Sequence, residues 1–345
     1  MAQPHMAPDS ESRPLVRLGT TDMHITRVGF GAWAIGGGDW AVGWGDQDDK
    51  DSIAAIRHAV DAGINWIDTA AVYGLGHSED VVRRALADIP EHDRPYVFTK
   101  CGLTWDPNDR KAPPRQVGAP DSLRREVDAS LQRLGVERID LYQMHWPAKD
   151  GTPLEVYWET LLDLKKEGKV RAVGLSNHDA KQLATAEAIG HVDTLQPPFS
   201  AIRRDAAAHE LPWCKAHDTG VIVYSPMQSG LLTGRFSIER AQRLPEDDWR
   251  SRNREFTGER LVHNLRLAEA MQPIAAKHGT TVPTIAVAWT LAWPGVTGAI
   301  VGARSPEQVD GWVDAAHLQL DADDLATLSA AIVATGVGSG PYTHD

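Results

Sequence analysis

Four side chains that can carry charge or transfer protons stand at, or just after, the ends of three apolar segments: Asp68, Tyr73, Lys100 and His145. Lys100 ends the apolar run at 96–99, where burial is expected, and a buried lysine normally needs a carboxylate partner. Asp68, at the end of the preceding apolar segment, is the candidate for that partner. Each residue alone has an ordinary structural explanation, whereas their joint placement favours a catalytic site.

The chemistry that suits this set is reduction of a carbonyl group, which needs a hydride and a proton. The hydroxyl of Tyr73 can donate the proton, but with an ordinary pKa of about 10 it is a weak acid. A lysine cation nearby would stabilise the tyrosinate and lower that pKa, and Asp68 would keep Lys100 charged and in place. His145 could donate a hydrogen bond to the substrate oxygen. The hydride must come from a cofactor, because no side chain supplies one.

The fold that would bring these residues together is indicated by eight short apolar segments: Val28–Trp33, Ile64–Ile67, Tyr96–Thr99, Ile139–His145, Val170–Leu175, Val192–Leu195, Val221–Tyr224 and Val296–Val301. Amphipathic helical patterns separate them, for example at Leu123, Val127, Leu131 and Leu134. Alternating strands and helices predict a parallel sheet. An open doubly wound sheet is an alternative, but eight strands favour a closed (β/α)8 TIM barrel, whose active site lies at the carboxyl ends of the strands.

Segments outside this repeat complete the predicted organisation. Residues 15–27 resemble a β-hairpin with its turn at Gly19–Asp22. A long insertion at 226–262, with an arginine-rich run at 250–254, is expected to add helices and loops at the C-terminal face. We expect a flexible N-terminal tail at 1–14, a single domain at 15–335, and a flexible C-terminal tail at 336–345.

Composition narrows the classes of function. The formal net charge of −12 and the pI of about 5.6 argue against a nucleic-acid partner. Two distant cysteines, Cys101 and Cys214, form neither a disulfide framework nor a metal pair, and no metal site is expected. The polar N-terminal segment lacks the features of a signal peptide, and no apolar stretch is long enough to span a membrane. We therefore expect a cytoplasmic protein.

A dinucleotide fingerprint near the N-terminus competes with the barrel interpretation. The segment Gly29-Phe30-Gly31-Ala32-Trp33-Ala34 fits G-x-G-x-x-A, and Asp49 and Asp51 follow at roughly the expected distance. The fingerprint needs a helix that opens at its glycines, whereas Gly36-Gly37-Gly38 and residues 40–46 predict a loop. We therefore favour the barrel over a Rossmann domain.

Over nearly its whole length the sequence resembles the aldo-keto reductases. The motifs that carry the resemblance are Asp68-Thr69-Ala70-Ala71-Val72-Tyr73-Gly74, Phe98-Thr99-Lys100, Asp140-Leu141-Tyr142-Gln143-Met144-His145, Gly168–Asn177, Tyr224-Ser225-Pro226, Gly230-Leu231-Leu232-Thr233-Gly234 and Gly302–Gln308. The resemblance implies a catalytic tetrad of Asp68, Tyr73, Lys100 and His145, with the roles described above.

The resemblance also implies a binding site for NADP(H). Matching positions would hold the carboxamide (Ser176, Asn177, Gln196), stack on the nicotinamide (Tyr224), cover the pyrophosphate (Ser225, Pro226, Met227, Ser229, Gly230, Leu231) and bind the adenosine end (Gly302, Arg304, Gln308). Arg304 suits a 2′-phosphate, with Arg235 as a second cation, so we expect NADPH to be preferred. Two positions depart from the family pattern. Trp312 stands where asparagine is frequent, which leaves the adenine contacts open, and Phe199 stands where tyrosine is common.

The substrate is the least defined part of the prediction. Trp33, Trp105 and Trp146, with Trp40 and Trp44 beside them in the predicted loops, indicate an aromatic pocket for an apolar carbonyl compound or a sugar-like ring. Two other functions remain open: a non-catalytic NADPH-binding regulatory subunit, and a lyase or aldolase that forms a Schiff base on Lys100. The sequence does not define the direction of the reaction or the oligomeric state.

Overall fold

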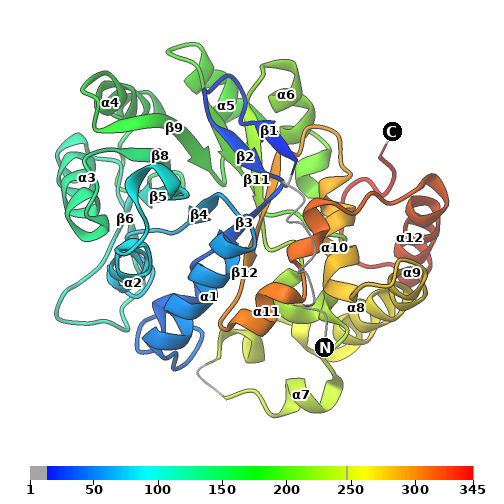
Figure 1. The fold of residues 1–345 in the computed structure, drawn as a ribbon. Coiled ribbons are helices and arrows are strands. Elements are labelled where there is room, and N and C mark those ends of the chain that lie inside the picture. The colour runs from blue at the N-terminus through cyan, green and yellow to red at the C-terminus, as the bar shows by residue number, and fades with distance from the viewer. Residues whose placement is uncertain (1–13, 246–247, 345) are drawn as a thin grey trace, which may run out of the picture.

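Eight parallel strands close into a barrel, and they follow one another around it in chain order (Figure 1). They are β3 (Val28–Gly31), β4 (Trp66–Asp68), β5 (Tyr96–Cys101), β8 (Ile139–Met144), β9 (Val170–Ser176), β10 (Thr194–Gln196), β11 (Gly220–Tyr224) and β12 (Gly298–Gly302). The pairing of Ala299 in β12 with Val28 in β3 begins the ladder that closes the barrel. This computed structural model describes residues 14–245 and 248–344, and it confirms the (β/α)8 prediction and a strand in each of the eight apolar segments.

Helices connect the strands and surround them (Figure 1). Those of the repeat are α1 (Asp49–Asp61), α2 (His77–Leu86), α3 (Pro120–Leu134), α4 (Leu154–Lys166), α5 (Ala180–Glu187), α6 (Glu210–Ala216), α10 (Val282–Leu291) and α11 (Pro306–Asp310). The others are α7 (Ile238–Gln242), α8 (Gly258–Ala270), α9 (Gln272–Lys277) and α12 (Ala322–Thr335). The predicted insertion at 226–262 holds α7, the first part of α8 and several short 3-10 turns.

The interior of the barrel changes from apolar to polar along the strands. Alternate residues of a strand point inward, so Trp66 and Phe98 pack together inside with Leu141, Ala172 and Ile222. Two residues further along the same strands, the inward positions carry Asp68 and Lys100. The apolar part of the interior therefore stabilises the barrel. The polar part, at the carboxyl ends of the strands, can form a site.

The predicted N-terminal hairpin closes the apolar end. Strands β1 (Leu15–Arg17) and β2 (His24–Thr26) pair antiparallel, and the side chains of Leu18, Met23 and Ile25 are fully buried in the same cluster as Trp66. The predicted flexible tail at 1–14 lies almost wholly outside the described residues. A second small hairpin, β6 (Leu103–Thr104) with β7 (Arg115–Gln116), lies in the β5–α3 connection.

Gly29, the first glycine of the possible dinucleotide-binding motif, has a different role in this structure. Gly29 lies inside β3, and a Cβ atom there would stand 2.2 Å from the indole ring of Trp66. No long helix opens at these glycines; a short 3-10 turn at Ala34–Gly36 follows. Gly29 thus makes room for a tryptophan in the barrel core.

Part of the predicted C-terminal tail contacts the barrel. Residues 337–341 lie on the loop after β10, where the guanidinium of Arg204 donates hydrogen bonds to the carbonyls of Val337 and Pro341.

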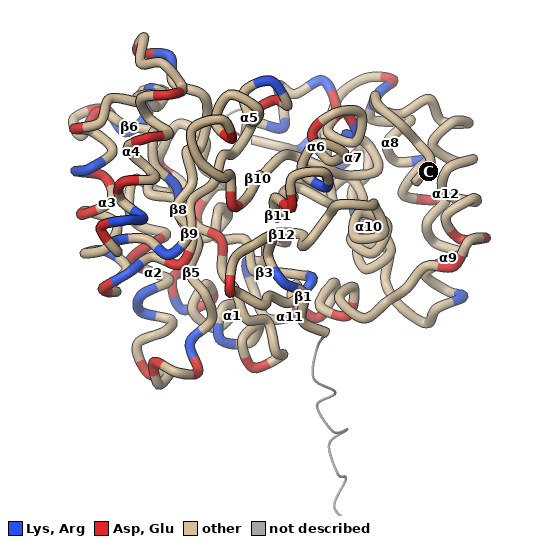
Figure 2. The backbone as a smooth tube through the Cα atoms, turned by 90° about the horizontal axis from the view of Figure 1, so that it is seen from above, with Lys and Arg blue, Asp and Glu red and all other residues tan. Residues whose placement is uncertain are grey.

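The positions of basic and acidic residues are interspersed along the outer helices (Figure 2). No helix among the described residues is both long and apolar enough to cross a membrane.

Candidate active site

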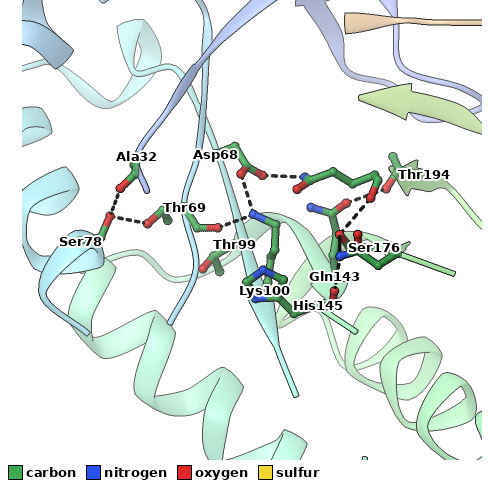
Figure 3. Close-up of polar contacts among 12 residues, drawn as sticks. Ala32, Asp68, Thr69, Ser78, Thr99, Lys100, Gln143, His145, Ser176 and Thr194 are labelled. Carbon is green, nitrogen blue, oxygen red and sulfur yellow. Dashed lines mark hydrogen bonds and ion pairs between the residues drawn. The ribbon is translucent and has the colours of Figure 1, made fainter. Parts of the chain in front are cut away.

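The four predicted catalytic residues meet at the carboxyl ends of β4, β5 and β8. Figure 3 shows three of them, Asp68, Lys100 and His145. Asp68 is the last residue of β4, Lys100 is the fifth residue of β5, and His145 directly follows β8. Tyr73 lies in the turn between β4 and α2. Parallel strands place their carboxyl ends at one edge, which is why residues up to 77 positions apart in sequence come together.

Asp68 and Lys100 form a buried ion pair. The Nζ atom of Lys100 lies 2.6 Å from Oδ2 of Asp68 and donates a second hydrogen bond, 2.9 Å long, to the carbonyl of Thr69 (Figure 3). Nε2 of Gln196 donates to the other carboxylate oxygen, Oδ1, at 2.8 Å. Burial pushes the pKa of Asp68 up and that of Lys100 down, while their mutual attraction opposes both shifts.

Tyr73 lies close to both the ion pair and the ring of His145. The Nζ atom of Lys100 is 5.2 Å from the centroid of the Tyr73 ring, and the ring of His145 packs edge-on at 5.7 Å. Burial, followed by the charge of Asp68, raises the pKa of Tyr73 well above 10. This direction is opposite to the lowering expected from Lys100. The main physical reason is burial, which disfavours the charged tyrosinate, and the negative charge of Asp68 adds to the same shift.

His145 is kept neutral by its surroundings. Burial, and next the charge of Lys100, lowers the pKa of His145 well below 6.5. Its Nδ1 atom is buried and has no hydrogen-bond partner among the described residues, whereas its backbone carbonyl accepts from Nδ2 of Asn177 at 2.9 Å. A neutral imidazole at a cavity wall is suited to donate a ring N–H to a ligand.

One cavity of about 840 Å³ unites most of the predicted site. Its wall includes Asp68, Tyr73, His145, Ser176, Asn177, Gln196, Tyr224, Ser225, Pro226, Met227, Ser229, Gly230, Arg235, Gly302, Arg304 and Gln308, together with Trp33, Trp40, Trp44 and Trp146. Lys100 lies behind the wall, Leu231 is buried, and Trp105 instead packs against the small cluster of Trp40, Ala70 and Val72. The sequence predicts a substrate contact for Trp105 because it is one of several tryptophans in loops at the barrel mouth. A sequence pattern does not define which side of such a loop faces the cavity.

The half of the cavity formed by β9 to β12 is shaped by unusual backbone geometry. Asn177 has a φ of 62°, and its Oδ1 accepts a hydrogen bond of 2.7 Å from the hydroxyl of Tyr224. Ser225, Gln228 and Ser229 also have positive φ values, between 46° and 59°. Such conformations are strained for residues with a Cβ atom and cluster at ligand sites. The loop over 225–230 therefore has the strained backbone that is typical of a ligand site.

Arg304 lies at the cavity wall, but its donors are engaged. Its Nε donates to Oε1 of Gln47 at 2.5 Å, and its terminal nitrogens donate to the carbonyls of Trp44 and Asp46. The backbone N–H of Arg304 donates to the side chain of Gln308 at 3.0 Å. The helix that follows, α11, has only five residues. Arg304 would have to exchange these contacts to bind a phosphate.

The sequence analysis did not assign Arg250, which lines the cavity, or Trp249, which packs behind its wall against Trp33. The guanidinium of Arg250 stacks 4.9 Å from the ring of Trp44, and the ring of Trp249 stacks on Trp33 at 6.2 Å. The arginine-rich run at 250–254 was the available signal, but its partners come from a loop about 200 residues earlier in the chain. Only a three-dimensional arrangement reveals that pairing.

The residues present fit a nicotinamide dinucleotide. Four arginines line the cavity, Arg235, Arg240, Arg250 and Arg304, and Arg250 is paired with Asp248 at 2.6 Å. The carboxylates of the lining are Glu307 and the paired Asp68. The local charge is therefore suited to an anionic ligand, although the whole chain is acidic. The loop at 225–230, the ring of Tyr224 and the neutral imidazole of His145 offer main-chain, aromatic and hydrogen-bonding contacts to such a ligand.

Comparisons with known proteins agree with this geometry. Residues 27–333 match the model of the aldo/keto reductase family. The chain is 38% identical to the NADH-specific methylglyoxal reductase of Escherichia coli strain K12, over 89% of this chain and 95% of that protein. It is 33% identical to an aldo-keto reductase of Bacillus subtilis strain 168, over 89% and 90% of the two chains.

A solved structure extends the likeness to three dimensions. The glycerol dehydrogenase of Gluconobacter oxydans matches with a TM-score of 0.85 and 36% identity, over 95% of this chain and 97% of that one. The family match and the relatives span the strands that carry the tetrad as well as the loops around the cavity. The chain belongs to the aldo-keto reductase family, whose members are oxidoreductases that act on carbonyl compounds with a nicotinamide cofactor.

Proposed function

We propose that this protein reduces an aldehyde or ketone to the alcohol, or catalyses the reverse reaction, with Tyr73 as the proton donor and NADPH as the preferred cofactor. The observation that carries the proposal is the shared cavity wall on which Tyr73 and His145 face the same space, with the Asp68–Lys100 pair directly behind. The reduced nicotinamide would supply the hydride. Every other part of the reaction is assigned to residues of the chain.

The residues act on the proton and on the carbonyl oxygen. The raised pKa of Tyr73 keeps its hydroxyl protonated at neutral pH, so the proton is present when the carbonyl oxygen gains charge. Lys100 would oppose the negative charge left on the phenol oxygen, and Asp68 holds the ammonium group in position. Neutral His145 can donate a ring N–H to the carbonyl oxygen. Trp33 and Trp146 offer apolar faces to a carbonyl compound or a sugar-like ring.

The Schiff-base alternative is disfavoured by the position of Lys100. Its Nζ atom makes two short hydrogen bonds and the side chain does not form part of the cavity wall. A Schiff base needs a free amine within reach of the substrate carbonyl. The regulatory-subunit alternative predicts cofactor binding without turnover, and the same experiment separates it from the proposal.

The experiment measures dissociation constants and turnover with NADPH and with NADH, over a panel of aldehydes, ketones and sugars followed by cofactor absorbance. The cofactor choice is open to a sharp test because Arg304 is bound to loop carbonyls and one relative is named NADH-specific. If Arg304 turns to a 2′-phosphate, Arg304→Ala should weaken NADPH by about ten- to a hundredfold and leave NADH nearly unchanged.

Arg235→Ala is the matched control, because it removes a second arginine from the same cavity wall. Equal weakening of both cofactors in Arg304→Ala would mean that Arg304 acts only by holding the loop at 44–47. Wild-type binding of either cofactor without turnover of any carbonyl compound would contradict the proposed enzyme and support the regulatory alternative.

A further inference from the structure

The loop that follows β10 is held by an arginine from which water is almost excluded. Arg204 is 3% exposed, and its guanidinium donates to the carbonyl of Pro341 at 2.9 Å, to that of Val337 at 3.1 Å and to that of Ala201. Two of these three acceptors belong to the C-terminal segment. The charge of Arg204 is thus satisfied only while that segment lies against the loop.

The C-terminal segment Val337–Pro341, here called the strap, is shaped for this contact. Ser339 pairs with Arg203 as an isolated parallel bridge, and its hydroxyl donates to Asp205 at 2.6 Å. Gly338 has a φ of 62°, and a Cβ atom on it would stand 1.6 Å from the carbonyl oxygen of Ile202. A Cβ atom on Gly340 would stand 2.5 Å from the backbone of Arg204. Only glycine at these positions allows the two backbones to approach so closely.

The other side of the loop supports the cofactor half of the cavity. The backbone N–H of Tyr224 donates to the carbonyl of Pro197, and that of Phe199 donates to the carbonyl of Tyr224, both at 3.1 Å. The hydroxyl of Ser200 donates to the side chain of Gln228 at 3.1 Å. Gln228 is one of the residues with positive φ in the 225–230 loop, and Tyr224 lines the cavity.

From this chain of contacts we propose that the strap is a positioning element for cofactor binding, acting through Arg204 on the 197–204 loop and from there on Tyr224 and Gln228. The inference rests on the proposed function, because it assigns the supported surface to the nicotinamide dinucleotide. The strap does not touch the tetrad in the described structure. Loss of the strap therefore weakens cofactor affinity while the proton-transfer groups stay in place.

The test compares substitutions at two glycines that have nearly the same positive φ. Gly338→Ala introduces the clash with Ile202, whereas Gly336→Ala has nearly the same φ, 64°, and nothing within 4 Å of the added methyl. Dissociation constants for NADPH and NADH are measured by quenching of tryptophan fluorescence, alongside kcat and KM. Hydrogen exchange of residues 337–341 reports whether the strap is displaced. A chain that ends at Gly336 provides a second variant in which the strap is certainly absent.

We expect Gly338→Ala and the shortened chain to bind the cofactor about 2- to 30-fold more weakly than Gly336→Ala, with kcat at saturating cofactor nearly unchanged. Lower thermal stability with an unchanged cofactor dissociation constant in the shortened chain would overturn the proposal, because the strap would then be merely structural. A wild-type protein that binds neither cofactor would instead refute the proposed function, so the two failures are distinguishable.

Discussion

Two ion pairs flank the same strand, one on each face of β5. Lys100 points into the barrel and pairs with Asp68 at 2.6 Å, while the preceding residue, Thr99, points outward and donates to Glu79 at 2.6 Å. Glu79 pairs in turn with Arg133 at 2.6 Å and joins α2 to α3. Both carboxylates are buried, and both pairs have similar geometry.

The difference lies in what else each pair can reach. The side chain of Arg133 is 21% exposed and can turn to solvent, whereas that of Lys100 is fully buried and has Tyr73 as its neighbour. The outer pair contributes to helix packing, and the inner pair controls the charge around a proton donor. Burial and short distances alone therefore do not distinguish a catalytic ion pair from a structural one. A titratable neighbour at a cavity wall does.

The largest expected effect follows removal of the group that the inner pair serves. Tyr73→Phe deletes one oxygen and should lower turnover by about 100- to 10,000-fold, while the fold and cofactor affinity are retained. Single-turnover rates and cofactor dissociation constants measure the two consequences separately. Rates close to wild type would exclude Tyr73 as the acid.

Breaking the inner pair should change both stability and the pH profile. Lys100→Met leaves the Asp68 charge uncompensated, which destabilises the fold by about 3–5 kcal/mol and raises the pKa of Tyr73 further. The pH midpoint of alcohol oxidation, where Tyr73 must accept a proton, should move to higher pH by about 1–3 units.

The double variant Asp68→Asn with Lys100→Met removes both charges and is the control. Its pH midpoint should return toward that of the wild type. An identical midpoint in wild type and Lys100→Met would show that the ion pair and Tyr73 are not coupled.

Breaking the outer pair should affect stability alone. Glu79→Gln keeps an acceptor for Thr99 but weakens the bond to Arg133, and we expect a loss of about 1–3 kcal/mol in the free energy of unfolding. Urea denaturation measures the loss, and kcat should equal that of the wild type. A shift in the pH profile of turnover would contradict the assignment of this pair as structural.

The smallest expected effect concerns two buried histidines, His145 at the cavity wall and His178 outside it. They repeat the comparison between a catalytic and a structural group. Burial lowers the pKa of His178 to about 4, and both of its ring nitrogens are hydrogen-bonded, to Tyr157 and to the carbonyl of Ser176. Its pKa is about 6.5 in the unfolded chain, so the unfolded state takes up a proton as the pH falls below that value. The native state therefore loses about 1.4 kcal/mol per pH unit until the pH approaches 4.

His178→Gln should remove about 2 kcal/mol of the destabilisation that develops between pH 6.5 and 5 without changing turnover. His145→Gln should flatten the same pH dependence but also impair turnover, because His145 faces the cavity. Denaturation curves at pH 7, 6 and 5 make the comparison. Impaired turnover in His178→Gln would remove the distinction between the two histidines.

Much of the architecture follows from local patterns in the sequence. Buried parallel strands produce short apolar runs, which is why all eight could be found, and the carboxyl ends of those runs identified Asp68, Lys100 and His145. The direction of the Tyr73 pKa shift could not be predicted, because it depends first on how completely the phenol is buried and next on its distance from Asp68.

Long-range pairings were equally inaccessible to sequence patterns. The stacking of Arg250 on Trp44 and the seating of the strap on Arg204 join segments more than 100 residues apart. Trp105 shows the same limit in a loop, where no periodicity defines which face of a residue turns toward the cavity.

The hairpin beneath the barrel has a consequence for how this enzyme can be changed. The buried side chains of Leu18, Met23 and Ile25 stabilise the end of the barrel opposite the cavity. Substitutions in the loops around the mouth should therefore have little effect on the stability of the fold. Libraries that randomise the loops bearing Trp33 and Trp146 should yield a high fraction of folded variants. Random substitutions in the hairpin should yield mostly insoluble protein. The barrel therefore tolerates substitutions at the cavity end and not at the hairpin end.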